Sequence, residues 1–162
     1  MLPVPGMSYE NMVLAYDGSM EGRRALREGA EVAVRFNACV HLLAVIKNNV
    51  GSAFGQSFDP RSLAAVEAAD LQRILDEGVA MLKNSGLEAN GHLVYGDPVD
   101  EIVRCAAAVH ADLVVVGHRE SSPLARWWRT PVSSSLVDKL SCSILIGMRD
   151  HIEAATNSDS PD

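Results

Sequence analysis

The regular alternation of short apolar runs with longer amphipathic segments is the feature that most constrains the fold. The apolar runs predict strands over residues 12–16, 39–46, 87–95, 113–116 and 143–148. Helical spacing of apolar residues predicts helices over residues 20–35, 63–85, 98–110 and 131–140. Because parallel strands are joined by right-handed helical crossovers, this order predicts an α/β fold, a doubly wound open sheet of five parallel strands with four helices.

Helix-start and helix-stop residues flank these segments. Ser19 and Ser62 are placed to cap the first and second helices, and Asp97 to cap the third, with Pro98 at its first position. Gly86 supplies a left-handed stop for the second helix. The side chains expected on the inner sides of the first two helices are Leu26, Ala30, Ala33, Val34, Leu63, Val66, Leu71, Ile74, Leu75, Val79 and Leu82.

The length of the chain predicts a single domain over residues 1–162, with a core over about 9–149 and a disordered tail over 150–162. Hydrophobic residues make up 48% of the chain but aromatic residues only 5%, so Ala, Val and Leu must fill the interior. Such an interior favours helices packed on a sheet.

The net charge and the lack of a targeting signal limit the partners and the location expected for the protein. The formal net charge of -7 argues against a nucleic-acid surface, which needs a basic patch. Neither a signal sequence nor a membrane-spanning apolar run is found, so we expect a cytoplasmic protein without a membrane contact. Cys39, Cys105 and Cys142 form no C-x-x-C pair and are expected to be reduced thiols.

Three strand ends are candidates for a binding site. In an open parallel sheet, ligands bind beyond the carboxyl ends of the strands where the strand order reverses. The first strand ends in Asp17, the second near Val45 and the fourth in Gly117. Together they offer a carboxylate, an apolar wall and a close backbone approach. Taken alone, however, residues 17–19 are better explained as a helix-capping turn than as part of a binding site.

Three blocks of the sequence resemble the universal stress protein family in their order and spacing. They are NMVLAYDGSMEGRRALREGAEVA, GDPVDEIVRCAAAVHADLVVVGHRE and LSCSILIGMRD. The resemblance covers residues 9–149 and implies a Rossmann-like, adenine-nucleotide-hydrolase-like sheet. It also implies a homodimer formed through the last strand, here 143–148, with Ile144 and Ile146 near the two-fold axis, and ATP binding in a subset of members.

The phosphate-binding signature of the ATP-binding members is only partly present. That signature is Gly, two residues, Gly, nine residues, Gly, then Ser or Thr. Its first glycine corresponds to Gly117, but Glu120, Thr130 and Pro131 stand at the other positions. Asp17 and Val45 match the adenine side of the site. The resemblance therefore gives as candidate nucleotide-binding residues Asp17, Val45, Gly117, His118, Arg119, Val132 and Ser133.

The departures weaken a phosphate site for physical reasons. Glutamate adds bulk and negative charge where glycine allows close approach, and Pro131 has no amide hydrogen to donate. Arg119, Arg126 and Arg129 leave a rebuilt anion site open as an alternative to a solvated loop. The role of the adjacent Trp127 and Trp128, as loop anchor or partner contact, also stays open.

Three functions follow from these patterns. The leading one is a non-catalytic, dimeric stress-response or signalling module that does not bind ATP tightly and acts on an unidentified protein partner. The second keeps the family but assigns ATP or another adenine nucleotide as ligand. The third, an adenine-nucleotide-dependent enzyme, is disfavoured because the first strand lacks a Ser-Gly-Gly phosphate loop and no catalytic motif is found.

Overall fold

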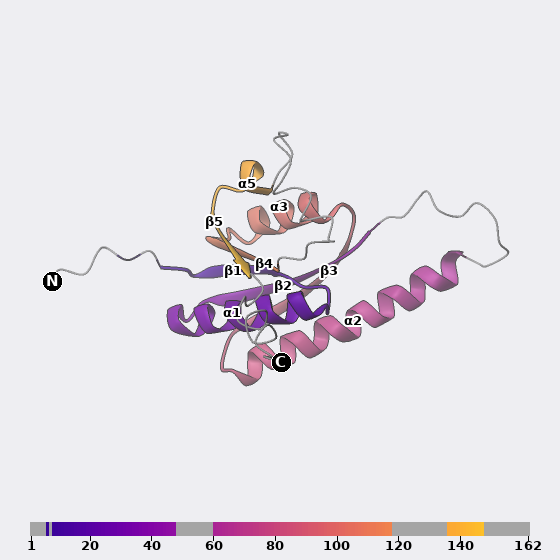
Figure 1. Ribbon diagram of the computed structural model, residues 1–162, viewed down its shortest axis with the longest axis horizontal. Coiled ribbons are helices and arrows are strands. Elements are labelled where there is room, and N and C mark those ends of the chain that lie inside the picture. Colours follow the sequence, from indigo (N-terminus) through magenta and orange to yellow (C-terminus); the bar gives the residue numbers. More distant parts are fainter. Residues whose placement is uncertain (1–5, 7, 48–59, 118–135, 148–162) are drawn as a thin grey trace, which may run out of the picture.

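The structure, a computed structural model, contains one parallel sheet. It describes residues 8–47, 60–117 and 136–147, together with Gly6. The strands are β1 (Asn11–Ala15), β2 (Cys39–Ile46), β3 (Ala89–Tyr95), β4 (Leu113–Gly117) and β5 (Ser143–Gly147). Their order is β3-β2-β1-β4-β5, and every neighbouring pair is parallel (Figure 1). The predicted sheet of five parallel strands is confirmed.

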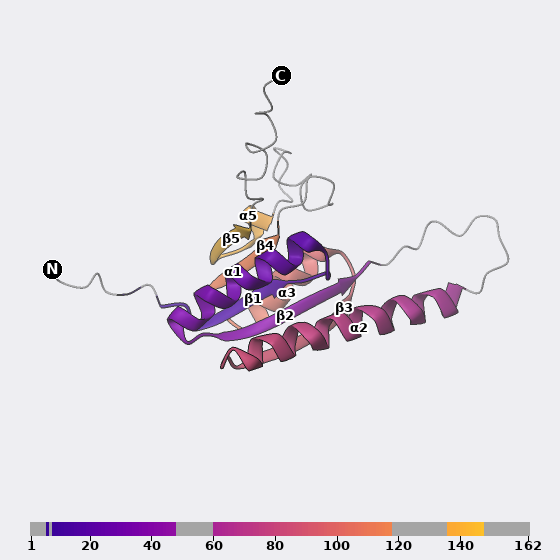
Figure 2. The ribbon, with the colours of Figure 1, turned by 60° about the horizontal axis from the view of Figure 1, so that its bottom comes forward.

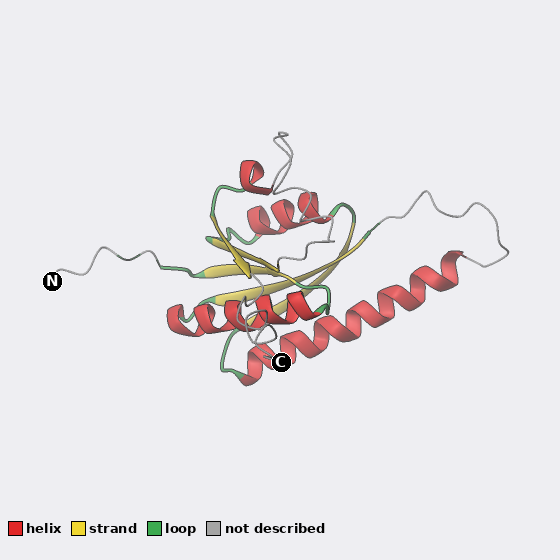
Figure 3. Cartoon of the chain, viewed as in Figure 1, coloured by secondary structure: helices red, strands yellow, loops and turns green. Residues whose placement is uncertain are grey.

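The helices cover both faces of this sheet. In the described part of the chain they are α1 (Met20–Phe36), α2 (Pro60–Asn84), α3 (Pro98–Ala108) and α5 (Leu136–Lys139). Helices α1 and α2 lie on one face, and α3 and α5 on the other (Figures 1 and 3). The doubly wound arrangement is therefore as predicted. Of the predicted last helix, residues 131–135 lie outside the described residues, as does the predicted tail.

Two apolar layers hold the helices to the sheet. The layer under α1 and α2 includes Leu14, Leu42 and Leu75, each at most 1% exposed. The layer under α3 and α5 includes Val13, Leu43, Ile102 and Leu136, also at most 1% exposed. Successive residues of β1 and β2 thus enter opposite layers, which explains why these strands are apolar without strict alternation.

Two predicted inner side chains are on the surface instead. Val34 is 53% exposed and Val66 is 60% exposed. Val34 borders a surface groove between α1 and α2 rather than the sheet. Val66 lies in the amino-terminal half of α2, which projects beyond the sheet and has no strand beneath it (Figures 1 and 2). Helical periodicity identifies an apolar stripe but not where the sheet ends.

The helix boundaries are set mainly by the predicted capping residues. The Ser19 hydroxyl accepts a hydrogen bond from the Gly22 amide at 3.0 Å, and Asp97 caps α3 as expected. Beyond α2, Gly86 has the left-handed φ of 82° that the stop requires. The prediction for Ser62 is wrong, because α2 begins earlier, at Pro60. Proline fits the first turn of a helix, where its missing amide hydrogen costs no hydrogen bond.

No described helix has the combination of length and apolar character that crossing a bilayer demands.

Removal of the α3 cap should destabilise the fold. Asp97→Ala leaves the amides of Val99 and Asp100 without their carboxylate acceptor, so we expect a loss of about 1 kcal/mol in the free energy of unfolding. Asp97→Ser keeps an acceptor and should retain most of the stability. Urea unfolding at one fixed protein concentration measures both variants. Equal stability of wild type and Asp97→Ala would show that the cap does not hold α3.

Candidate functional site

The strand order reverses between β1 and β4, and the candidate residues gather at that edge of the sheet. In the order β3-β2-β1-β4-β5, strands β2 and β3 extend from β1 in one direction and β5 from β4 in the other. Asp17, Val45 and Gly117 all lie at the carboxyl ends of their strands, as predicted. The remaining predicted positions are outside the described residues, namely His118, Arg119, Glu120, Thr130, Pro131, Val132 and Ser133.

Asp17 is an exposed carboxylate held in a defined position. Its Oδ1 accepts a hydrogen bond from the Ser19 amide at 2.9 Å, which fixes the turn between β1 and α1. A Cβ atom on Gly22 would lie 2.7 Å from Asp17 Oδ1, so glycine at this position leaves room for the carboxylate. A carboxylate can accept about four hydrogen bonds, and Asp17 retains capacity for a ribose hydroxyl or an amino group.

Val45 provides the apolar side of this edge. It pairs in register with Val94 of β3 and is half-buried, with its side chain packed against the layer under α3. The next residue, Ile46, accepts a hydrogen bond from the Gly96 amide at 3.0 Å, which joins the turn after β3 to the end of β2. An apolar wall beside a carboxylate is the arrangement expected for one side of an adenine pocket.

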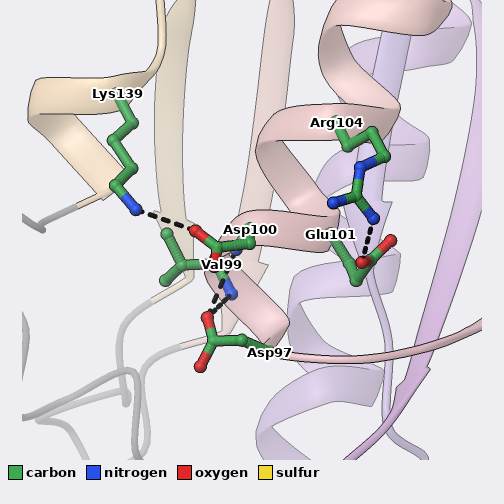
Figure 4. Close-up of polar contacts among 6 residues, drawn as sticks. All are labelled: Asp97, Val99, Asp100, Glu101, Arg104 and Lys139. Carbon is green, nitrogen blue, oxygen red and sulfur yellow. Dashed lines mark hydrogen bonds and ion pairs between the residues drawn. The ribbon is translucent and has the colours of Figure 1, made fainter.

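The amino terminus of α3 also lies at this edge, but its amides already have partners. Asp97 Oδ1 accepts from the Val99 amide at 3.0 Å and from the Asp100 amide at 3.3 Å (Figure 4). Ser19 fills the same role for α1. A helix terminus binds an anion through unpaired amides, so a phosphate at α1 or α3 would have to displace one of these caps.

The structure also identifies charged contacts beside α3 that the sequence analysis did not find. Lys139 Nζ donates to Asp100 Oδ1 at 2.8 Å and joins α5 to the first turn of α3 (Figure 4). Glu101 and Arg104 are three residues apart on one helix, which is the spacing of a helical ion pair, so the sequence alone could have predicted this contact. The Lys139 contact spans residues distant along the chain, and only the fold brings them together.

Glu101 is the single buried charged residue among those described, with 8% of its surface exposed. Its side chain packs under the turn after β3, where a Cβ atom on Gly96 would lie 2.8 Å from Glu101 Oε1. Gly96 has a φ of 153°, so any other residue would be both strained and crowded. Arg104 pairs with the carboxylate from the solvent side. This pair consequently supports the turn that borders the site.

The thiols of Cys105, within α3, and Cys142, directly before β5, are not activated as nucleophiles. Burial, with a smaller contribution from Glu101, raises the pKa of the Cys105 thiol. Burial, with a contribution from Asp112, also raises the pKa of Cys142. All three cysteines of the chain are free. A raised pKa disfavours the thiolate, which is the nucleophilic form of cysteine.

Comparison with known proteins places this geometry in a family. The family model of the universal stress protein family matches residues 8–146. A universal stress protein of Methanocaldococcus jannaschii is 26% identical over 140 residues, which covers 85% of this chain and 81% of the relative.

Solved structures show the same fold. A member of the universal stress protein family from Burkholderia pseudomallei matches with a TM-score of 0.69 at 24% identity, over 88% of this chain and 98% of that chain. A universal stress protein solved in complex with cAMP matches with a TM-score of 0.64 at 25% identity, over 88% of this chain and 99% of that chain. Since the family model spans most of the sequence and these structures share its fold, the chain belongs to the universal stress protein family.

Proposed function

We propose that this universal stress protein is a non-catalytic, cytoplasmic stress-response module that acts as a homodimer and does not bind ATP tightly. The proposal rests on the capping hydrogen bonds at the helix amino termini of the candidate site. Ser19 accepts from the Gly22 amide of α1, and Asp97 accepts from the Val99 and Asp100 amides of α3. The two described helices that begin at this edge therefore offer few free donors to a polyphosphate.

Most hydrogen-bond donors for a phosphate would then have to come from the segment after Gly117. The sequence of that segment has Glu120, Thr130 and Pro131 at positions where the ATP-binding signature has two glycines and a hydroxyl residue. Glutamate repels a phosphate, and proline withholds an amide donor. The described part of the edge adds the exposed carboxylates of Asp17 and Asp97, which also disfavour a ligand with several negative charges.

An adenine nucleotide with fewer phosphates is the second candidate. Asp17, Val45 and Gly117 lie at the carboxyl ends of their strands, which supports an adenine and ribose side at this edge, and a similar protein has been solved with cAMP. A monophosphate needs fewer donors than ATP and brings less charge to the acidic edge. This candidate differs from the first in its ligand and not in the fold.

The absence of catalysis is proposed on the chemistry of the described side chains. At the candidate edge, Asp17 and Asp97 are both engaged in capping hydrogen bonds. Burial raises the pKa of the Cys105 and Cys142 thiols, which disfavours the nucleophilic thiolate. A nucleophile paired with a base is the usual mark of covalent catalysis, and these groups do not supply one.

The homodimer is proposed on the position of β5. This strand lies at one end of the strand order and, among the described residues, pairs only with β4. Ile144, Leu145 and Ile146 are all partly exposed. An apolar edge strand with unpaired backbone groups favours pairing with the same strand of a second copy across a two-fold axis.

A charge on β5 should dissociate this dimer. Ile146→Asp places a carboxylate in the proposed interface, so we expect light scattering at micromolar concentration to change from dimer to monomer. Val66→Asp is the matched control, because Val66 is 60% exposed on α2 and far along the chain from β5. Circular dichroism checks that both variants fold. A folded Ile146→Asp protein that stays dimeric would exclude β5 as the interface.

Calorimetric titration should show little affinity for ATP. With ATP and Mg²⁺ we expect no saturation in the low micromolar range, because Ser19 and Asp97 engage amides at the starts of α1 and α3 and two of the three signature glycines are missing. The same titration with AMP and cAMP separates the second candidate from the first. A stoichiometric ATP isotherm in that range would overturn the proposed subgroup and favour a phosphate site rebuilt from Arg119, Arg126 and Arg129.

Restoration of the signature should create affinity for ATP. The variant Glu120→Gly, Thr130→Gly, Pro131→Ser returns backbone donors, each worth roughly 1.5–3 kcal/mol when bonded to a charged oxygen. We expect a saturable isotherm where the wild type has none. Asp17→Ala added to this variant should abolish the gain by removing the adenine-side carboxylate. A folded, dimeric triple variant without affinity would mean that the adenine side is also lost.

A further inference from the structure

A sulfur and two imidazoles gather on the sheet far from the carboxyl-end edge. Cys39 and His41 are two residues apart on β2, so their side chains share the face turned away from α2. His92 on β3 lies beside Leu43, two residues further along β2. The three side chains are half-buried, and none takes part in the site described above. Their contacts form a chain from the thiol through one imidazole to the other.

The contacts define which nitrogen of His41 faces the sulfur. His41 Nδ1 is 3.0 Å from His92 Nε2, and His41 Nε2 is 3.7 Å from Cys39 Sγ. Both contacts are satisfied when His41 Nδ1–H donates to His92 Nε2, because His41 Nε2 then presents a lone pair to the thiol. A metal-binding histidine commonly has this arrangement, in which its second ring nitrogen donates to an outer partner that fixes the tautomer.

The distance between Cys39 Sγ and His41 Nε2 suits two ligands of one metal ion. A tetrahedral Zn²⁺ with bonds of about 2.3 Å to sulfur and about 2.0–2.1 Å to nitrogen separates those two atoms by about 3.6 Å. The observed 3.7 Å between Cys39 Sγ and His41 Nε2 therefore needs almost no rearrangement. The lone pair of His41 Nε2 faces the sulfur while Nδ1 faces His92, so the ring is oriented to act as a ligand without a change of its contacts.

We propose that Cys39 Sγ and His41 Nε2 bind a borderline-soft divalent metal ion such as Zn²⁺, with His92 as the positioning residue that orients His41. Thiolate and imidazole together select such ions over Mg²⁺ and Ca²⁺. In the described part of the chain, no group of three or more His, Cys, Asp and Glu side chains is arranged around one ion. Water completes the coordination, and the site is open and exchangeable rather than a closed structural one.

Neighbouring groups affect the charge balance of this site. Burial, and then the carboxylate of Glu88, raise the pKa of the Cys39 thiol, while a hydrogen bond from Asn90 Nδ2 to Cys39 Sγ at 3.7 Å opposes the rise. The ion must displace the thiol proton, which is released to solvent, when the thiolate–metal bond forms. Binding should consequently tighten as pH rises through the neutral range, and Glu88 adds a negative charge that favours the bound cation.

Co²⁺ is a suitable probe, because a cobalt–thiolate bond gives a charge-transfer absorption band that imidazole or carboxylate ligands do not. Tag-free, reduced full-length protein is titrated with Co²⁺, and Zn²⁺ is then added as competitor. We expect the band to appear with one Co²⁺ per chain, to strengthen with pH and to disappear on addition of Zn²⁺ but not of Mg²⁺. A wild-type protein that shows no such band would overturn the proposal.

Matched variants assign the ligands. Cys39→Ser should remove the band, whereas the double control Cys105→Ser, Cys142→Ser should keep it. His92→Ala should weaken binding about tenfold by loss of the outer acceptor, and His92→Gln should restore part of the affinity because its amide oxygen can accept the same hydrogen bond. Each variant is checked for folding by circular dichroism. A band that persists in Cys39→Ser, or is lost in the double control, would refute this site.

Discussion

Burial of the central strands on both faces is the constraint on which the rest of the structure depends. Met12, Val13 and Leu14 of β1 are at most 1% exposed, although their side chains enter two different layers. Such a strand is stable only when both faces of the sheet are covered, here by helices on each side. The right-handed crossovers that achieve this also bring the start of each following helix to the carboxyl edge.

The residues available for binding a ligand or partner therefore lie in the parts of the fold that are not buried. Turns at the carboxyl edge present Asp17 and Asp97, and β5 forms one edge of the sheet in the part of the chain that the structure describes. Strands β2 and β3 at the other side of the sheet carry partly exposed polar side chains. These three regions are separate in space and chemistry. Nucleotide binding, dimer formation and metal binding can therefore be tested by independent substitutions.

The capping residues link stability to ligand choice. A carboxylate or hydroxyl that stabilises a helix start occupies the amides that an anion would otherwise use. At α3, Oδ1 of Asp97 accepts hydrogen bonds from two amides, which are therefore not available to an anion. The same side chains that define the helix starts at this edge thus occupy amides that a phosphate would otherwise use.

The sequence by itself determined the strands, most helix boundaries and the family, because apolar periodicity, Ser19 and Asp97 are local signals that burial and capping enforce. It also placed Asp17, Val45 and Gly117 at one edge, since parallel strands end together. Only the tertiary structure decided that Val66 lies beyond the sheet, that Lys139 reaches Asp100, and that His41 meets His92. These contacts depend on how far each element extends and on the strand register, which no local pattern contains.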